Sequence, residues 1–219
     1  MDNIKHLLFK QFKIVAMLTV AMLFSIIILM IRMKLTHSFF YLFLVWNLFL
    51  AVIPYAITTY LVSLPKLNKL WLGFWFGVWL LFLPNAPYLV TDLIHLRLST
   101  PKLIWLDILT VLSFALSGLL LFYFSFIEMK EILKLHVKKQ ILSFFTPFIV
   151  FLSAFGVYLG RFLRYNSWEV IQNPLDLFED IFQILLYPSQ NLELWLFILV
   201  FGAFLNLGFW MFNNIKSSN

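Results

Sequence analysis

The chain has 219 residues, of which 63% are hydrophobic and 12% charged, and its mean hydropathy is +0.94. This composition leaves too little polar surface for a soluble globular protein, and the absence of cysteine excludes disulfides, thiolate metal sites and cysteine nucleophiles. The net charge of +6 does not indicate nucleic-acid binding, because the basic residues lie in short segments between apolar stretches. We therefore expect an all-α polytopic membrane protein, a single integral membrane domain over 1–219, with membrane lipids as partners and no nucleic acid.

Six apolar stretches predict about six transmembrane helices, since roughly 20 residues of helix cross a bilayer. They are Ile14–Ile31, Phe39–Val62, Leu70–Leu83, Leu103–Ile127, Ile141–Gly160 and Leu192–Phe212. No small-residue cleavage site follows the first stretch, so we expect that helix to be retained rather than removed as a signal peptide.

The distribution of basic residues predicts the orientation. The N-terminus, the second and fourth connections and the C-terminal tail hold ten of the 16 Lys and Arg residues, and the other connections hold six. Basic residues concentrate on the cytoplasmic side, so both termini should be cytoplasmic. The segments 84–102 and 161–191 would then share the extracytoplasmic face.

The third stretch, Leu70–Leu83, is short: its 14 residues span roughly 21 Å of helix against about 30 Å of hydrocarbon. Pro84 and Pro87 follow it, and each proline removes a backbone donor and disfavours helix in the preceding residue. We predict a broken third helix at Pro84–Pro87 that resumes as Tyr88–Leu98. The alternative is a tilted helix that ends at Pro84.

The break and the resumed segment carry the first polar cluster, with Asn85, Asp92, His95 and Arg97. Asn85 and Arg97 are candidate substrate-binding residues. Asp92 and His95 are three residues apart, so they share a helical face and could act as a catalytic acid/base pair. The alternative is that Asp92 caps a helix while His95 and Arg97 are interface anchors. The four histidines are scattered along the chain, so we expect neither a metal site nor a cofactor.

Asp107 lies about six residues, or roughly 9 Å, inside the fourth span. An unpaired carboxylate is costly at that depth. We therefore expect it to meet Arg97, Arg161, Arg164 or a water-filled cavity, and we include it among the candidate substrate-binding residues.

The second polar cluster is G-R-F-L-R-Y-N-S-W-E, at 160–169. Arg161 and Arg164 are three apart, so a continuing helix would present both to a phosphate or carboxylate. The alternative is that they only anchor the chain to lipid phosphates. Asn166 and Glu169 complete this candidate substrate-binding set, whereas Ser167 lacks the surroundings of a nucleophile.

An amphipathic helix is predicted near 173–187. Asn173 and Pro174 form a helix start, and apolar residues form one stripe while acidic residues form the other. We expect this helix to lie on the outer membrane surface.

The segments P-N-A-P-Y-L-V-T-D-L-I-H-L, at 84–96, and G-V-Y-L-G-R-F-L-R-Y-N-S-W-E, at 156–169, resemble the DUF1361 family of bacterial multi-pass membrane proteins. The resemblance covers nearly the whole chain and implies an uncharacterised protein of the bacterial cell membrane. The family has no activity to carry over.

Two classes of function remain open. The first is an enzyme that acts on a lipid or lipid-linked anion at the extracytoplasmic face, with Asp92 and His95 as acid and base and the arginines binding phosphate. The second is a small transporter, which a homo-oligomer could complete, or a non-catalytic envelope factor. In both cases Asp92, His95, Arg161 and Arg164 should form one constellation. No protein partner is indicated.

Overall fold

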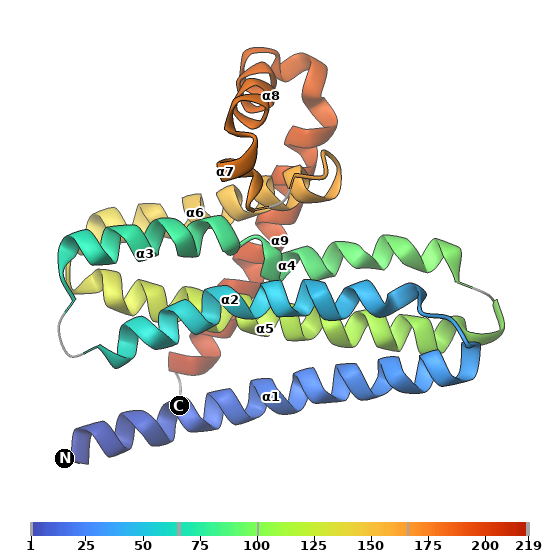
Figure 1. The fold of residues 1–219 in the computed structure, drawn as a ribbon. Coiled ribbons are helices and arrows are strands. Elements are labelled where there is room, and N and C mark those ends of the chain that lie inside the picture. Colours follow the sequence, from blue (N-terminus) through green and yellow to red (C-terminus); the bar gives the residue numbers. More distant parts are fainter. Residues whose placement is uncertain (1, 65–66, 100, 166, 218–219) are drawn as a thin grey trace.

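The computed structural model describes residues 2–64, 67–99, 101–165 and 167–217, and these ranges contain helices and no strand (Figure 1). The α-helices are α1 (Asp2–Thr36), α2 (Phe43–Ser63), α3 (Lys69–Phe82), α4 (Asn85–Thr91), α5 (Ile104–Lys134), α6 (Lys139–Arg161), α7 (Glu169–Gln172), α8 (Pro174–Leu186) and α9 (Leu192–Ser217). Short 3-10 helices are η1 (Phe40–Leu42), η2 (Asp92–Leu98), η3 (Pro101–Leu103) and η4 (Pro188–Asn191).

In the part of the chain that the structure describes, six helical segments are long and apolar enough to cross a membrane, which confirms an all-α polytopic membrane protein. They are Gln11–Thr36, Phe40–Ser63, Lys69–Leu98, Pro101–Lys134, Gln140–Arg161 and Pro188–Asn214. The third segment has 30 residues because α4 and η2 continue the direction of α3 (Figure 1). The polar segment after Pro84 is therefore part of a span rather than a loop outside the bundle.

The third span is broken at Leu83 and Pro84, as predicted, but the break is shorter than expected. Both residues keep right-handed helical dihedrals, and α4 resumes at Asn85 rather than at Tyr88. The Leu83 amide still donates to Trp79 O at 2.8 Å, and the Tyr88 amide donates to Pro84 O at 3.0 Å. Pro87 is tolerated because it lies in the first turn of α4, where amide groups lack partners within the helix. The result is a local interruption rather than an open chain.

Helix α5 lies at the centre of the bundle and packs against α1, α2 and α4, while α6 pairs with α9 (Figure 1). The approach of α4 to α5 is close at Gly118, where a Cβ atom would collide with the carbonyl oxygen of Ala86 and with the side chain of Leu89. The approach of α6 to the break is equally close, because a Cβ atom at Gly156 would lie 2.5 Å from Pro84 Cγ. These two glycines let α4 lie between α5 and α6.

Helix α8 confirms the predicted amphipathic helix, and it lies with α7 to one side of the bundle (Figure 1, top). Its buried residues are Leu177 and Ile184. Three residues of the predicted apolar stripe face away from the protein. Their exposed fractions are 82% for Leu175, 60% for Phe178 and 61% for Phe182. An apolar stripe without protein contacts is typical of a helix that contacts lipid.

Candidate functional site

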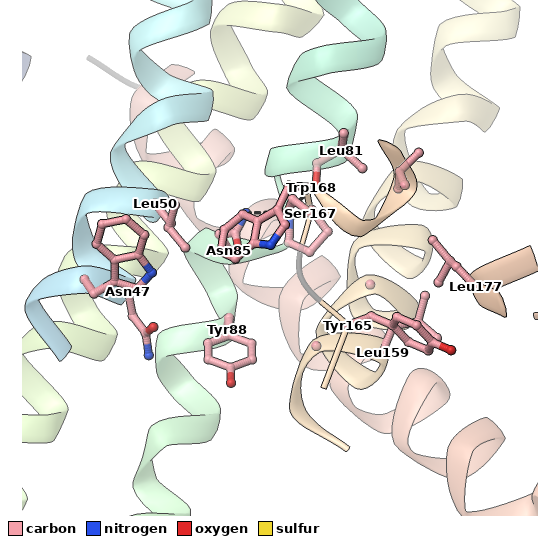
Figure 2. Close-up of a pocket in the computed structure, with 15 residues that line it drawn as sticks. Asn47, Leu50, Leu81, Asn85, Tyr88, Leu159, Tyr165, Ser167, Trp168 and Leu177 are labelled. Atoms are coloured by element: carbon pink, nitrogen blue, oxygen red, sulfur yellow. Dashed lines mark hydrogen bonds between the residues drawn. The ribbon is translucent and has the colours of Figure 1, made fainter. Parts of the chain in front are cut away.

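A pocket of about 150 Å³ lies at the break in the third span (Figure 2). Helices α2, α3, α4, α6, α7 and α8 form its walls, together with Tyr165, Ser167 and Trp168 between α6 and α7. The described lining residues are Trp46, Asn47, Leu50, Leu81, Pro84, Asn85, Tyr88, Gly156, Leu159, Gly160, Tyr165, Ser167, Trp168, Val170 and Leu177. Figure 2 shows Asn47 and Leu50 on one side, Asn85 and Tyr88 in the middle, and Leu159, Tyr165 and Leu177 on the other side.

The two polar segments meet at this pocket. The side-chain amide of Asn85 donates to Ser167 Oγ at 3.0 Å and to the carbonyl oxygen of Phe82 at 3.0 Å. The Ser167 hydroxyl donates to the carbonyl oxygen of Leu81 at 3.2 Å. The two bonds of Ser167 attach the segment after α6 to Asn85 and to the Leu81 carbonyl group near the end of α3.

A buried ion pair joins the same segments at a second point. The Arg161 guanidinium donates through Nη2 to Asp92 Oδ1 and through Nε to Thr91 Oγ1, the latter at 2.8 Å. The Asp92 side chain is fully buried and the Arg161 side chain is only 10% exposed. Asn47 on α2 donates from Nδ2 to Asp92 Oδ2 at 3.1 Å, so each carboxylate oxygen of Asp92 has a donor.

The ion pair lies directly behind two lining residues. The guanidinium carbon of Arg161 is 4.0 Å from the centre of the Tyr88 ring, a cation–π contact. Asn47 lines the pocket and also donates to Asp92. The charges are therefore coupled to the pocket through Tyr88 and Asn47, while none of the described lining residues carries a formal charge.

His95 lies beside Asp92 but outside the described lining of the pocket. Its Nδ1 is 3.1 Å from the backbone carbonyl oxygen of Asp92 and 3.7 Å from Asp92 Oδ1, and its ring centre is 4.8 Å from that of Phe43. The predicted proximity of Asp92 and His95 is thus present. Their predicted acid/base roles stay a prediction.

Asp107 has a different partner from those predicted. Its Oδ1 accepts from Arg32 Nε at 2.9 Å, and both side chains are buried. Arg32 also donates to the carbonyl oxygen of Ser38 and lies over the ring of Tyr41. The predicted first span, Ile14–Ile31, ends one residue before Arg32, whereas α1 extends through Arg32 to Thr36. Arg97 is exposed at the end of η2 and does not meet Asp107 within the described contacts.

The predicted pairing of Arg161 with Arg164 on one helical face is wrong, because α6 ends at Arg161. Arg164 is exposed and has a left-handed backbone, with φ of 63°. The candidate residue Asn166 lies outside the described residues, and Glu169 begins α7 in a half-buried position.

Tyr165 connects the segment after α6 to α8. Its hydroxyl donates to Asp180 Oδ2 at 2.7 Å, and this hydrogen bond, more than burial, raises the pKa of Tyr165 to about 12. The raised pKa extends to higher pH the range in which the Tyr165 hydroxyl can donate to Asp180. The Tyr165 amide also donates to the carbonyl oxygen of Leu159 at 3.0 Å, which turns the chain back over the end of α6.

Sequence reasoning missed Asn47, Tyr88 and Arg32 as site or partner residues. Asn47 carried a usable signal, because an amide within a predicted span normally has a polar partner. Arg32 lies one residue beyond the predicted span Ile14–Ile31, so those bounds hid its position within α1. Tyr88 carried no such signal, since aromatic residues are abundant in this chain. Among the residues that the structure describes, no three His, Asp or Glu side chains are grouped so that they could hold a metal ion.

A family model described as "Protein of unknown function (DUF1361)" matches residues 46–207, which include every described residue of the pocket and the Asp92–Arg161 pair. The chain belongs to the DUF1361 family. No curated protein and no solved structure is detectably similar to it.

Proposed function

We propose that this DUF1361 protein binds a lipid or lipid-linked molecule, with the polar part of that molecule in the pocket at the broken third span. The observation that carries the proposal is the convergence of two distant polar segments on that pocket. The Asn85–Ser167 bond and the Asp92–Arg161 pair both cross between them. Buried polar groups are costly in a membrane protein, and they mark functional sites by default.

The size and position of the pocket support a ligand with an apolar remainder. About 150 Å³ is on the order of ten times the volume that one water needs, but less than pockets that enclose a whole small molecule. Trp46 lines the pocket and is 55% exposed, so the lining reaches the outer surface of α2, where lipid chains would lie. A ligand can thus place its polar end in the pocket and its chains in the bilayer.

The geometry favours binding over catalysis. Asp92 is fully buried and both of its oxygens accept hydrogen bonds, which suits a group that holds Arg161 and Asn47 in place. A general base needs a route to the proton that it abstracts, and His95 does not line the pocket. We therefore favour a non-catalytic binding role, with Asp92 and Arg161 as positioning residues for Asn47 and Tyr88.

We further propose that the site faces the extracytoplasmic side of a bacterial cell membrane, with both termini cytoplasmic. The support is the excess of basic residues in the N-terminus, the second and fourth connections and the tail. The chain has no cysteine, so single cysteines at Lys102, Asn173 and Lys134 can be labelled in intact cells. Labelling at positions 102 and 173 but not 134 supports this orientation, and the reverse pattern contradicts it.

The binding proposal is tested by native mass spectrometry of the protein released from detergent micelles. A co-purifying lipid should appear at one copy per chain and should fall at least tenfold in Asn85→Leu, which removes the amide from the pocket. Asn206→Leu is the matched control, since Asn206 lies on α9, outside the described pocket lining, and donates to the carbonyl oxygen of Gly202. Leu50→Trp, which fills the pocket and leaves the Asn85–Ser167 bond intact, should also lose the lipid. Equal lipid in all four proteins contradicts the proposal.

A further inference from the structure

We infer that the polar group bound in this pocket is uncharged and rich in hydroxyls, as in the sugar headgroup of a glycolipid, rather than a phosphate. The inference rests on the binding function proposed above and names its ligand class. It replaces the anionic ligand that the two arginines suggested in the sequence.

Among the residues that the structure describes, the pocket offers no free cation to an anion. The Arg161 guanidinium, which contacts the lining residue Tyr88, has its charge paired with Asp92 and also donates to Thr91 Oγ1. Arg164 is exposed and is not among the described lining residues. A phosphate in the pocket would lose hydration without gaining a charge partner, which is strongly unfavourable in a low-dielectric site.

The lining instead offers neutral hydrogen-bonding groups. Both amide hydrogens of Asn85 are used by Ser167 and Phe82, and within the described part of the chain no donor reaches its Oδ1. Asn47 uses one amide hydrogen on Asp92, so the other hydrogen and Oδ1 have no described protein partner. The Tyr88 hydroxyl likewise has none. The lining therefore offers an acceptor on Asn85, a donor and an acceptor on Asn47, and a phenol hydroxyl on Tyr88. These groups match the hydroxyls of a ligand, because a hydroxyl both donates and accepts hydrogen bonds.

Aromatic rings complete the match. Trp46, Tyr88, Tyr165 and Trp168 line the pocket, and Trp168 directly follows Ser167, to which Asn85 donates. A sugar ring presents apolar C–H faces and a polar hydroxyl edge. Indole and phenol rings pack against the apolar C–H faces, while side-chain amides form hydrogen bonds with the hydroxyl edge. A phosphate has no apolar face to use these rings.

The test compares two lipids with identical acyl chains, a diacylglycerol monoglucoside and phosphatidylglycerol, added to protein purified in a zwitterionic detergent without a sugar. We expect native mass spectrometry to show at least tenfold tighter binding of the glucoside. This binding should be lost in Asn85→Leu and in Leu50→Trp and retained in Asn206→Leu. Thermal melts of each variant identify any that fails to fold, and the remaining pocket variant then decides the result.

The outcomes separate this inference from the proposed function. If phosphatidylglycerol binds as tightly or more tightly, and that binding is lost in the pocket variants, the sugar inference is overturned while lipid binding stands. If neither lipid depends on the pocket variants, both fail. Methyl glucoside supplies the sugar without acyl chains, and we expect it to compete at least a hundredfold more weakly than the glucoside lipid. Equal competition would keep the sugar specificity but contradict a lipid ligand.

Discussion

Neutralising Asp92 should destabilise the protein strongly, because it leaves the Arg161 guanidinium buried without its counter-charge. Asp92→Asn keeps the shape of the side chain. However, the new NH2 group must face either the Arg161 donor or the Asn47 donor, since both now point at carboxylate oxygens. Breaking a buried ion pair by removing one partner costs about 3–5 kcal/mol. We expect a loss in this range, given side-chain exposures of 0% for Asp92 and 10% for Arg161.

The double variant Asp92→Leu, Arg161→Met separates the cost of losing the ion pair from the cost of leaving one charge buried without its partner. It removes both charges and keeps apolar volume, so it should be less destabilised than either single charge removal, as for other buried pairs. The measurement is denaturant unfolding in mixed micelles, followed by tryptophan fluorescence. Glu131→Gln is the control, because the Glu131–Lys134 pair has side-chain exposures of 58% and 49% and should contribute about 0–1 kcal/mol. A cost below about 1 kcal/mol for Asp92→Asn, or full additivity of the two single variants, would refute a buried ionised pair.

Two further predictions follow from the packing. Gly156→Ala should lower the free energy of unfolding by about 1–3 kcal/mol in the same assay, because its Cβ atom would lie 2.5 Å from Pro84 Cγ. Gly73→Ala is the control: its Cβ atom would meet nothing within 4 Å, so the free energy of unfolding should stay the same or rise by up to about 1 kcal/mol. An environment-sensitive fluorophore on Phe178→Cys should show blue-shifted emission in vesicles relative to one on Glu179→Cys, because α8 directs its exposed apolar stripe to lipid. Emission at the same long wavelength from both positions would place α8 in water.

The break in the third span could be predicted because its cause is local. Proline at position 84 removes a donor whatever surrounds it, and the residue counts on either side set the position of the break within the span. The resumption of the helix was predicted three residues late. Pro87 lies in the first turn of α4, where a missing amide hydrogen costs nothing, and this placement depends on where α4 begins.

The partners of the buried charges could not be predicted from spacing. Residues three or four apart on a helix are neighbours, so the proximity of Asp92 and His95 was accessible. The Asp92–Arg161 contact joins residues 69 apart in sequence, and Arg32–Asp107 joins residues 75 apart. These contacts depend on the position of each helix along the axis of its neighbour. Side-chain packing between the helices sets that position.

The helical walls of the pocket owe their positions to close backbone approaches. Gly118 lets α4 come against α5, and Gly156 lets α6 come against Pro84, so packing holds these walls at fixed separation. Tyr165, Ser167 and Trp168 add a wall from the segment between α6 and α7. The Asp92–Arg161 pair then fixes Asn47 and Tyr88 from behind. A charge pair that is satisfied within the protein stabilises these neutral lining groups without offering its own charge to a ligand. Because Asp92 and Arg161 pair with each other behind the lining, a cluster rich in charged residues forms a site whose described surface is uncharged. Removing the pair should therefore alter the shape of the pocket without changing the class of ligand that the lining residues select.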